Sequence, residues 1–220
     1  MIAERLRQVR ERVERVAEKA GRDPGEITLL AVSKIKPASD IVLAYQAGQR
    51  DFGESYVQEF REKSVELGDL PGARFHMIGK LQSNKSSLAG VLFDAIQSVD
   101  SVKLARRLGR CERPLDVFIE VKLSEEDAKG GVEPERIDEV AAAVRECSNL
   151  KLRGLMTMPP WTDDPEASRP YFRRLRELAK ERSLEELSMG MSRDLEIAVE
   201  EGSTMVRVGT AIFGPRNPKK

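Results

Sequence analysis

Residues 27–54, ITLLAVSKIKPASDIVLAYQAGQRDFGE, contain one full repeat of the pattern on which the predicted fold rests. The apolar run 27–33 has strand character, the segment from Pro37 to Gly48 has helical spacing, and residues 51–54 form a second short strand. Strands that are apolar along their whole length are typical of parallel strands covered by helices. This repeat therefore predicts a parallel α/β arrangement.

The same alternation continues along the whole chain. Further strands are expected at 74–78, 95–99, 115–123, 150–158, 187–191 and 205–210. Helices are expected between them at 56–67, 85–91, 101–110, 134–146, 168–182 and 193–201. Eight strands, each followed by a helix or by the C-terminal tail, predict a single (β/α)8 TIM barrel, with residues 1–220 as one domain. A doubly wound open sheet is the alternative.

An additional N-terminal helix is expected ahead of the first strand. Its apolar residues are spaced by three or four positions and form one stripe: Ile2, Leu6, Val9, Val13, Val16 and Ala20. Gly21 follows as a typical helix end. We expect this stripe to pack on the barrel, and a docking face for a partner is the alternative.

Composition excludes several classes of protein. The 37 basic and 37 acidic residues cancel, so no net field attracts nucleic acid or an anionic membrane. Two cysteines, Cys111 and Cys147, cannot form a disulfide framework, and His76 is the only histidine. No signal peptide and no apolar run long enough to span a membrane is present. We expect a cytoplasmic, monomeric protein.

Lys34 is the most informative candidate for chemistry. It follows the apolar run of the first strand, and the functional face of such barrels lies at the carboxyl ends of the strands. A partly desolvated lysine there has a lowered pKa and a neutral amine that attacks carbonyl groups. A strand-end lysine that reaches out to solvent is the alternative, and Lys36, two residues on, is the weaker candidate.

The carboxyl ends of the seventh and eighth strands predict an anion site. Gly190 and Gly209 permit close approach to the backbone, and Ser192 and Thr210 supply hydroxyl groups. Barrels commonly bind phosphate at these two loops. Tight turns with a serine that caps a helix are the alternative. A reactive lysine together with a phosphate site indicates pyridoxal 5′-phosphate.

Two further polar residues lie within strands. Arg207 interrupts the apolar run MVRVG, and a buried guanidinium needs an acceptor, either in a salt bridge or on a ligand. His76 is either a ligand contact or a hydrogen-bonded core residue. Glu54 could pair with either of these two side chains.

Long motifs show that the chain resembles a known family. AVSKIKP (31–37), AGQRDFGESYVQE (47–59), FHMIGKLQSNK (75–85), RGLMTMPP (153–160) and LSMGMSRDLEIAVEEGSTMVRVGTAIFGPR (187–216) resemble the pyridoxal phosphate homeostasis proteins. The resemblance extends from about residue 27 to 216. It implies a barrel of the alanine-racemase type that binds pyridoxal phosphate covalently.

The resemblance also implies roles for individual residues. Lys34 would be the Schiff-base lysine, and Arg207 would face the pyridine nitrogen, which weakens the cofactor as an electron sink. Ser192, Gly209 and Thr210 would hold the phosphate, and Ser55 and His76 complete the expected cofactor-binding set. The chain departs from the family at Ser55, where the family typically has asparagine, and at Lys80, where it often has histidine. The resemblance therefore does not determine which polar groups contact the cofactor ring.

The resemblance implies a carrier of the cofactor in vitamin B6 homeostasis, which delivers it to apo-enzymes without catalysis of its own. Because ten residues follow Thr210 in the sequence, we expect no second domain of the kind that racemase relatives carry. A single-domain, pyridoxal phosphate-dependent amino-acid racemase or lyase is the alternative. Without the resemblance, an isomerase of a phosphorylated sugar is a third possibility, with Glu54 or Glu120 as the base.

Overall fold

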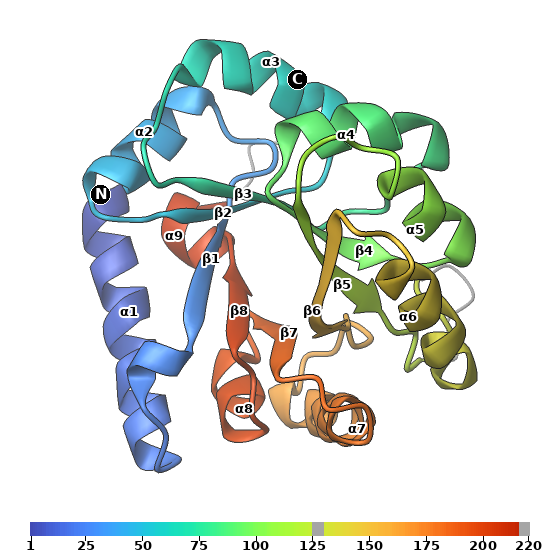
Figure 1. Ribbon diagram of the computed structural model, residues 1–220. Coiled ribbons are helices and arrows are strands. Elements are labelled where there is room, and N and C mark those ends of the chain that lie inside the picture. Colours follow the sequence, from blue (N-terminus) through green and yellow to red (C-terminus); the bar gives the residue numbers. More distant parts are fainter. Residues whose placement is uncertain (125–129, 216–220) are drawn as a thin grey trace.

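The computed structural model describes residues 1–124 and 130–215, and in this part of the chain eight parallel strands form a closed barrel (Figure 1). Each strand pairs with the next one along the chain, and the last strand pairs with the first. Helices cover the outside of the barrel (Figure 1). The predicted (β/α)8 barrel is confirmed, and the open-sheet alternative is wrong.

The bounds of the elements follow the predicted order closely. The strands are β1 (Thr28–Val32), β2 (Asp51–Glu54), β3 (Arg74–Met77), β4 (Ala95–Val99), β5 (Leu115–Glu120), β6 (Leu150–Met156), β7 (Glu186–Met191) and β8 (Met205–Val208). The α-helices are α1 (Ile2–Lys19), α2 (Ala38–Gln46), α3 (Val57–Leu67), α4 (Ser86–Leu92), α5 (Val102–Leu108), α6 (Ile137–Arg145), α7 (Arg169–Lys180), α8 (Leu195–Glu200) and α9 (Thr210–Phe213). Single 3-10 turns precede β1, α4, α6 and α7.

Apolar side chains form two separate clusters. The larger cluster fills the space between the strands and the helices, where Phe60 of α3 contacts Phe75 and Phe93 at ring-centroid distances of 4.6 and 4.8 Å. A smaller cluster comprises Leu30, Ile78, Phe118, Met156 and Met205. The strands are therefore buried on both sides, which explains why their sequences are continuous apolar runs.

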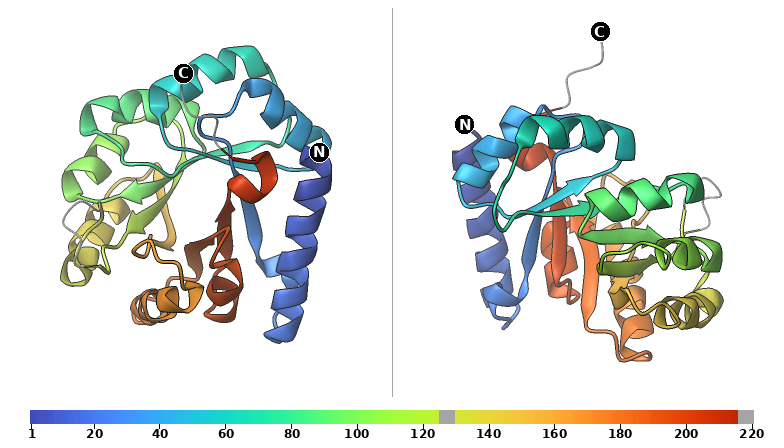
Figure 2. Two further views of the ribbon diagram at one scale, coloured as in Figure 1. Left: turned by 180° about the vertical axis from the view of Figure 1, so that it is seen from behind. Right: turned by 45° about the horizontal axis from the view of Figure 1, so that its top comes forward.

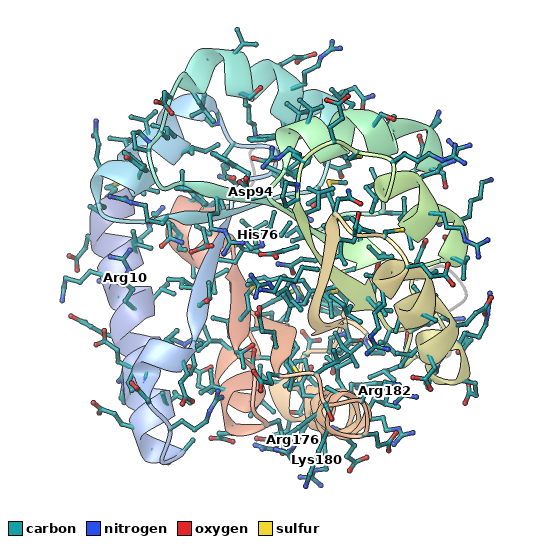
Figure 3. All side chains as sticks on the ribbon, viewed as in Figure 1. Arg10, His76, Asp94, Arg176, Lys180 and Arg182 are labelled. Atoms are coloured by element: carbon teal, nitrogen blue, oxygen red, sulfur yellow. The ribbon has the colours of Figure 1, made fainter. Side chains whose placement is uncertain are left out.

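The N-terminal helix packs on the barrel, as its stripe predicts. Leu6, Val9, Val13 and Val16 are buried, and α1 contacts α2, α8 and α9 (Figure 2, left). Ala20 is exposed and Ala17 is buried in its place, because the helix ends at Lys19 and Ala20 is already its cap. Helix α7 has the same design, with Phe172, Leu175 and Leu178 buried and its basic side chains on the outer face (Figure 3).

The structure differs from the predicted elements after β7 and after β8. The helix expected at 193–201 begins only at Leu195, because the Asp194 carboxylate accepts a hydrogen bond from the Met191 amide at 2.6 Å and closes a turn first. The residues after β8, expected as a tail, begin with the short helix α9. In the described part of the chain, no helix is both long enough and apolar enough to cross a bilayer.

Gly190 provides a test of the close packing beside β7. Its φ is +91°, and a Cβ at this position would overlap the Cβ of Ala198. We expect Gly190→Ala to lower the free energy of unfolding by about 2–4 kcal/mol, because it combines backbone strain with an overpacked contact. Gly21→Ala is the control, since Gly21 also has a positive φ (+68°) but would place its Cβ in open space. Urea titration followed by circular dichroism measures both, and equal losses would contradict the packing argument.

Candidate functional site

A cavity of about 300 Å³ opens at the mouth of the barrel, the end where the carboxyl ends of the strands meet. Its walls come from segments far apart in the sequence: the turns after β1 and β7 and the segments after β6 and β8. Of the predicted site residues, the cavity brings together Lys34, Ser192, Arg207, Gly209 and Thr210. Ser55 and His76 do not line it.

Lys34 lies in the turn that follows β1 and lines the cavity. The strand ends at Val32, one residue earlier than the sequence predicts, so the position of Lys34 depends on the turn. The side chain is half-buried, between the fully buried Ser33 and the exposed Ile35. Ile35 has a φ of +60°, which is unusual for a β-branched residue.

Arg207 reaches the cavity from inside the barrel and is 4% exposed. Its Nη1 donates to the Ser188 hydroxyl and its Nη2 to the Thr157 carbonyl, both at 2.8 Å. Burial lowers the pKa of Arg207 to about 10, so the guanidinium stays charged at neutral pH. These neutral acceptors hold the side chain in place without cancelling its charge. Among the described residues, Arg207 does not form the salt bridge considered as an alternative.

A chain of buried hydrogen bonds continues from Arg207 across the barrel. The Ser188 hydroxyl donates to Gln97 Oε1 at 2.6 Å, and Gln97 Nε2 lies 3.0 Å from His76 Nδ1. Because an amide nitrogen only donates, His76 Nδ1 is the acceptor and Nε2 carries the proton. That proton points to Asp51 Oδ1 at 3.2 Å. The chain therefore runs in one direction, from a guanidinium to a carboxylate.

His76 is enclosed by this chain in the middle of the barrel (Figure 3). It is 1% exposed, and both ring nitrogens have partners inside the protein. The geometry corresponds to the hydrogen-bonded core residue that the sequence left as an alternative. A direct contact of His76 with a cofactor stays a prediction that the position of the side chain does not favour.

The predicted anion site lies on one side of the cavity. Ser192 and Gly209 are half-buried and Thr210 is exposed, so their polar groups are accessible from the cavity. Arg12 of α1 donates to the Ser192 carbonyl at 3.0 Å and also pairs with Glu196. Gly209 lies close to β1, because a Cβ there would lie 3.2 Å from the carbonyl oxygen of the last residue of that strand, which is a tight contact. These contacts bind the loop after β7 to α1 and place the segment after β8 against β1, the strand that leads into the turn of the lysine.

Ser55 is 8% exposed and lies against Gly79. A Cβ at Gly79 would come within 2.8 Å of the Ser55 side chain, so the glycine makes room for it. Ser55 is therefore packed against the segment that follows β3 and does not line the cavity. Its predicted contact with a ligand stays a prediction.

Glu54 pairs with neither His76 nor Arg207, and both pairings considered from the sequence are wrong. Its carboxylate lies 2.9 Å from Lys63 Nζ of α3 and 2.8 Å from the Ser33 hydroxyl. The side chain is fully buried, and desolvation raises its pKa. The outward direction of alternate residues along β2 turns Glu54 toward the helix and away from the cavity.

Two cavity residues were missed or underrated in the sequence. Trp161 follows the two prolines that end the β6 segment, is 73% exposed, and has Arg193 5.0 Å above its ring. Lys36, the weaker lysine candidate, also lines the cavity, and its Nζ donates to the carbonyls of Phe213 and Pro215. The signal for Trp161 was available, because it stands just beyond a strand end. Within the described residues, no group of histidine, cysteine, aspartate or glutamate could hold a metal ion.

Comparisons with known proteins match the chain over nearly its whole length. The family model of the alanine racemase N-terminal domain matches residues 5–217. The pyridoxal phosphate homeostasis protein of Pseudomonas aeruginosa is 46% identical over 222 residues, which cover 98% of this chain and 96% of that protein. The protein of the same name from Escherichia coli strain K12 is 44% identical, with coverage of 100% and 98%.

Solved structures also match the chain over nearly its whole length. PipY of Synechococcus elongatus, solved with pyridoxal phosphate bound, is 40% identical and superposes with a TM-score of 0.86 over 97% of this chain and 100% of that chain. The alanine racemase of Corynebacterium glutamicum has a TM-score of 0.70 at 18% identity, over 96% of this chain and 60% of that enzyme. The second likeness is one of fold alone.

Glu120, at the end of β5, gives a prediction of pH dependence. The side chain is 5% exposed, and desolvation, only partly offset by Arg207, raises its pKa to about 7 from 4.5. The folded state therefore holds this proton more tightly than the unfolded state. As pH rises from about 4.5 to about 7, Glu120 should lower the free energy of unfolding by up to about 3 kcal/mol.

Glu120→Gln should remove this loss, so the variant should gain stability relative to the unmodified protein between about pH 5 and pH 8. Urea unfolding at the two pH values measures the gain. Glu112→Gln is the matched control, because Glu112 is solvent-exposed just before the same strand. A constant difference between Glu120→Gln and the unmodified protein would show that Glu120 is ionised throughout.

Proposed function

Because the chain belongs to the family of the pyridoxal phosphate homeostasis proteins, we propose that it binds pyridoxal 5′-phosphate through Lys34 and takes part in vitamin B6 homeostasis. The observation that carries the proposal is the shared cavity of Lys34, Arg207, Ser192 and Thr210. An amine can condense with an aldehyde, a guanidinium can donate a hydrogen bond to a pyridine nitrogen, and hydroxyl groups can donate to a phosphate.

The residues present fit this cofactor. A volume of about 300 Å³ is at the lower end of small-molecule sites, and part of the lining is apolar. Lys34 would provide the amine for a Schiff base with the aldehyde. Ser192, Gly209 and Thr210 would hold the phosphate. When bound, the cofactor supplies an aldehyde that exchanges between amines.

Arg207 supports a carrier in preference to an enzyme. Its guanidinium keeps its charge and is held by Ser188 and Thr157, so it can face the ring nitrogen without giving up a proton. A pyridine nitrogen that stays unprotonated is a weak electron sink. The cofactor would therefore be stored with little activation of a bound amino acid.

The remaining cavity residues also support this role. Inversion at an α-carbon needs a second acid–base group on the face opposite the lysine. No histidine, tyrosine or cysteine is found among the described lining residues. Asp194 lines the cavity, but its two oxygens accept from the Met191 amide and the Ser168 hydroxyl. Neither Glu54 nor Glu120 lines it, which removes support for the sugar isomerase.

We further propose delivery of the cofactor to apo-enzymes by a monomeric, cytoplasmic protein. The open mouth of the barrel, with Trp161 and the half-exposed Met158 at its rim, supports access for a recipient. The two cysteines are both free thiols, which agrees with a reducing compartment.

Lys34→Ala tests the covalent linkage. After incubation with pyridoxal phosphate and gel filtration, the unmodified protein should show the visible absorption of an imine, which borohydride should abolish. Mass spectrometry of the reduced protein should locate the pyridoxyl group on Lys34. Lys36→Ala is the control, because Lys36 lines the same cavity. Equal labelling of Lys34→Ala and unmodified protein would refute the assignment.

The choice between carrier and racemase rests on a second measurement. The loaded protein should restore activity to an apo-enzyme that depends on pyridoxal phosphate, because its Schiff base can exchange. Chiral chromatography of L-alanine incubated with the loaded protein should give no more D-alanine than free cofactor does. The reason is that the other lysine and the carboxylate of the described lining, Lys36 and Asp194, are already held in hydrogen bonds with the protein. Inversion well above that background would establish the racemase instead.

A further inference from the structure

A buried cluster of charged side chains lies behind the turn that carries Lys34. Lys63 of α3 has a side chain that is 9% exposed, and Glu54 of β2 has one that is fully buried. Lys63 Nζ lies 2.9 Å from Glu54 Oε1, 2.5 Å from Glu59 Oε1 and 2.9 Å from the Ser33 carbonyl oxygen. These three oxygens match the three N–H donors of an ammonium group.

The cluster binds the residue on each side of Lys34. The Ser33 hydroxyl donates to Glu54 Oε1 at 2.8 Å, and the Ser33 carbonyl accepts from Lys63. On the other side, the Ile35 amide donates to Glu59 Oε1 at 2.6 Å. The backbone before and after the lysine is therefore held by two elements, β2 and α3.

This support acts on a strained backbone. Ile35 has a φ of +60°, and a β-branched residue in this region persists only where its surroundings determine the conformation. The hydrogen bond from the Ile35 amide to Glu59 is one of two contacts that secure the turn from α3, and the other is the bond from Lys63 to the Ser33 carbonyl. Lys36 closes the turn, because its amide donates to the Ser33 carbonyl at 3.0 Å.

The chemical nature of the cluster indicates a purpose other than stability. The other buried residues of α3 are all apolar, and Lys63 shares their face. A buried ion pair is often no more stable than apolar residues of the same volume. One oxygen of Glu54, Oε2, has no hydrogen-bond partner among the described atoms, so the pairing is not even fully satisfied. An apolar residue at position 63 could not bind the Ser33 carbonyl.

We propose that Lys63, Glu54 and Glu59 are positioning residues, which hold the turn 33–36 so that the Lys34 amine is presented to the cavity. The inference rests on the proposed function, in which Lys34 binds the cofactor. It adds residues that do not line the cavity and assigns them a defined effect: without them, the protein folds, but the lysine is no longer held for imine formation.

Glu59→Ala is the sharpest test, because Glu59 lies at the edge of the cluster with a side chain that is 27% exposed. In the cofactor-free protein, the Ile35 amide should exchange with deuterium about 10- to 100-fold faster, since it loses a charged acceptor. The dissociation constant for pyridoxal phosphate, from the visible imine band, should rise about 10-fold or more. Glu59→Gln should restore part of the protection of the Ile35 amide and part of the affinity for pyridoxal phosphate, because the glutamine side-chain oxygen still accepts from Ile35.

Glu62→Ala is the matched control, since Glu62 is exposed on the same helix. It should change neither amide exchange nor cofactor affinity. Faster exchange in Glu59→Ala with unchanged affinity would overturn the proposal, and so would unchanged exchange. If the unmodified protein forms no imine, the proposed function fails, while the exchange measurement still reports whether the cluster holds the turn.

The double variant Lys63→Met with Glu54→Gln separates positioning from stability. It removes both buried charges together, so its unfolding midpoint should be closer to that of the unmodified protein than the midpoint of Lys63→Met alone. Its affinity for pyridoxal phosphate should stay low, because methionine cannot donate to the Ser33 carbonyl. Recovery of both stability and affinity would show that the cluster is only structural.

Discussion

Hydrogen bonds between β1 and β8 close the barrel, with Leu30 opposite Arg207 and Ala31 opposite Val208. A parallel sheet of this length would otherwise leave two strand edges exposed. The closure places the turn after β1 beside the segment after β8, so residues that follow the first and the last strand share one cavity although they are far apart in sequence. Each property of the candidate site depends on this pairing.

Closure also creates an interior that contains more than apolar side chains. The chain from Arg207 through Ser188, Gln97 and His76 to Asp51 crosses the barrel, and each donor in it has an acceptor. Buried polar groups are tolerated when they are satisfied in this way. The result is an arginine whose direction is determined by the protein before any ligand binds. On the outer side of the barrel wall, the charged cluster of α3 and β2 holds the turn of the lysine through hydrogen bonds to Ser33 and Ile35.

The elements could be predicted from the sequence because each has a local cause, such as the stripe of α1 or the serine that caps α5. Helix α9 was missed because four residues carry too little periodic pattern. Lys34 and Arg207 both line the cavity, because the order of the strands brings their carboxyl ends together, and the contact of these two residues with a cofactor stays a prediction. The partners of His76 and Glu54 were not found, since they depend on which residue of a neighbouring element lies opposite each side chain.

From the amino-acid sequence alone, we could infer the order of strands and helices apart from α9, the closed parallel architecture and the family to which the chain belongs. These follow from residue patterns that are local or that extend along the whole chain. The partners of the buried charges, and the set of candidate residues that share the cavity, became known only from the folded barrel. The physical reason is that a buried charge is stabilised by atoms within a few ångströms, and those atoms come from segments that only the closed barrel brings together.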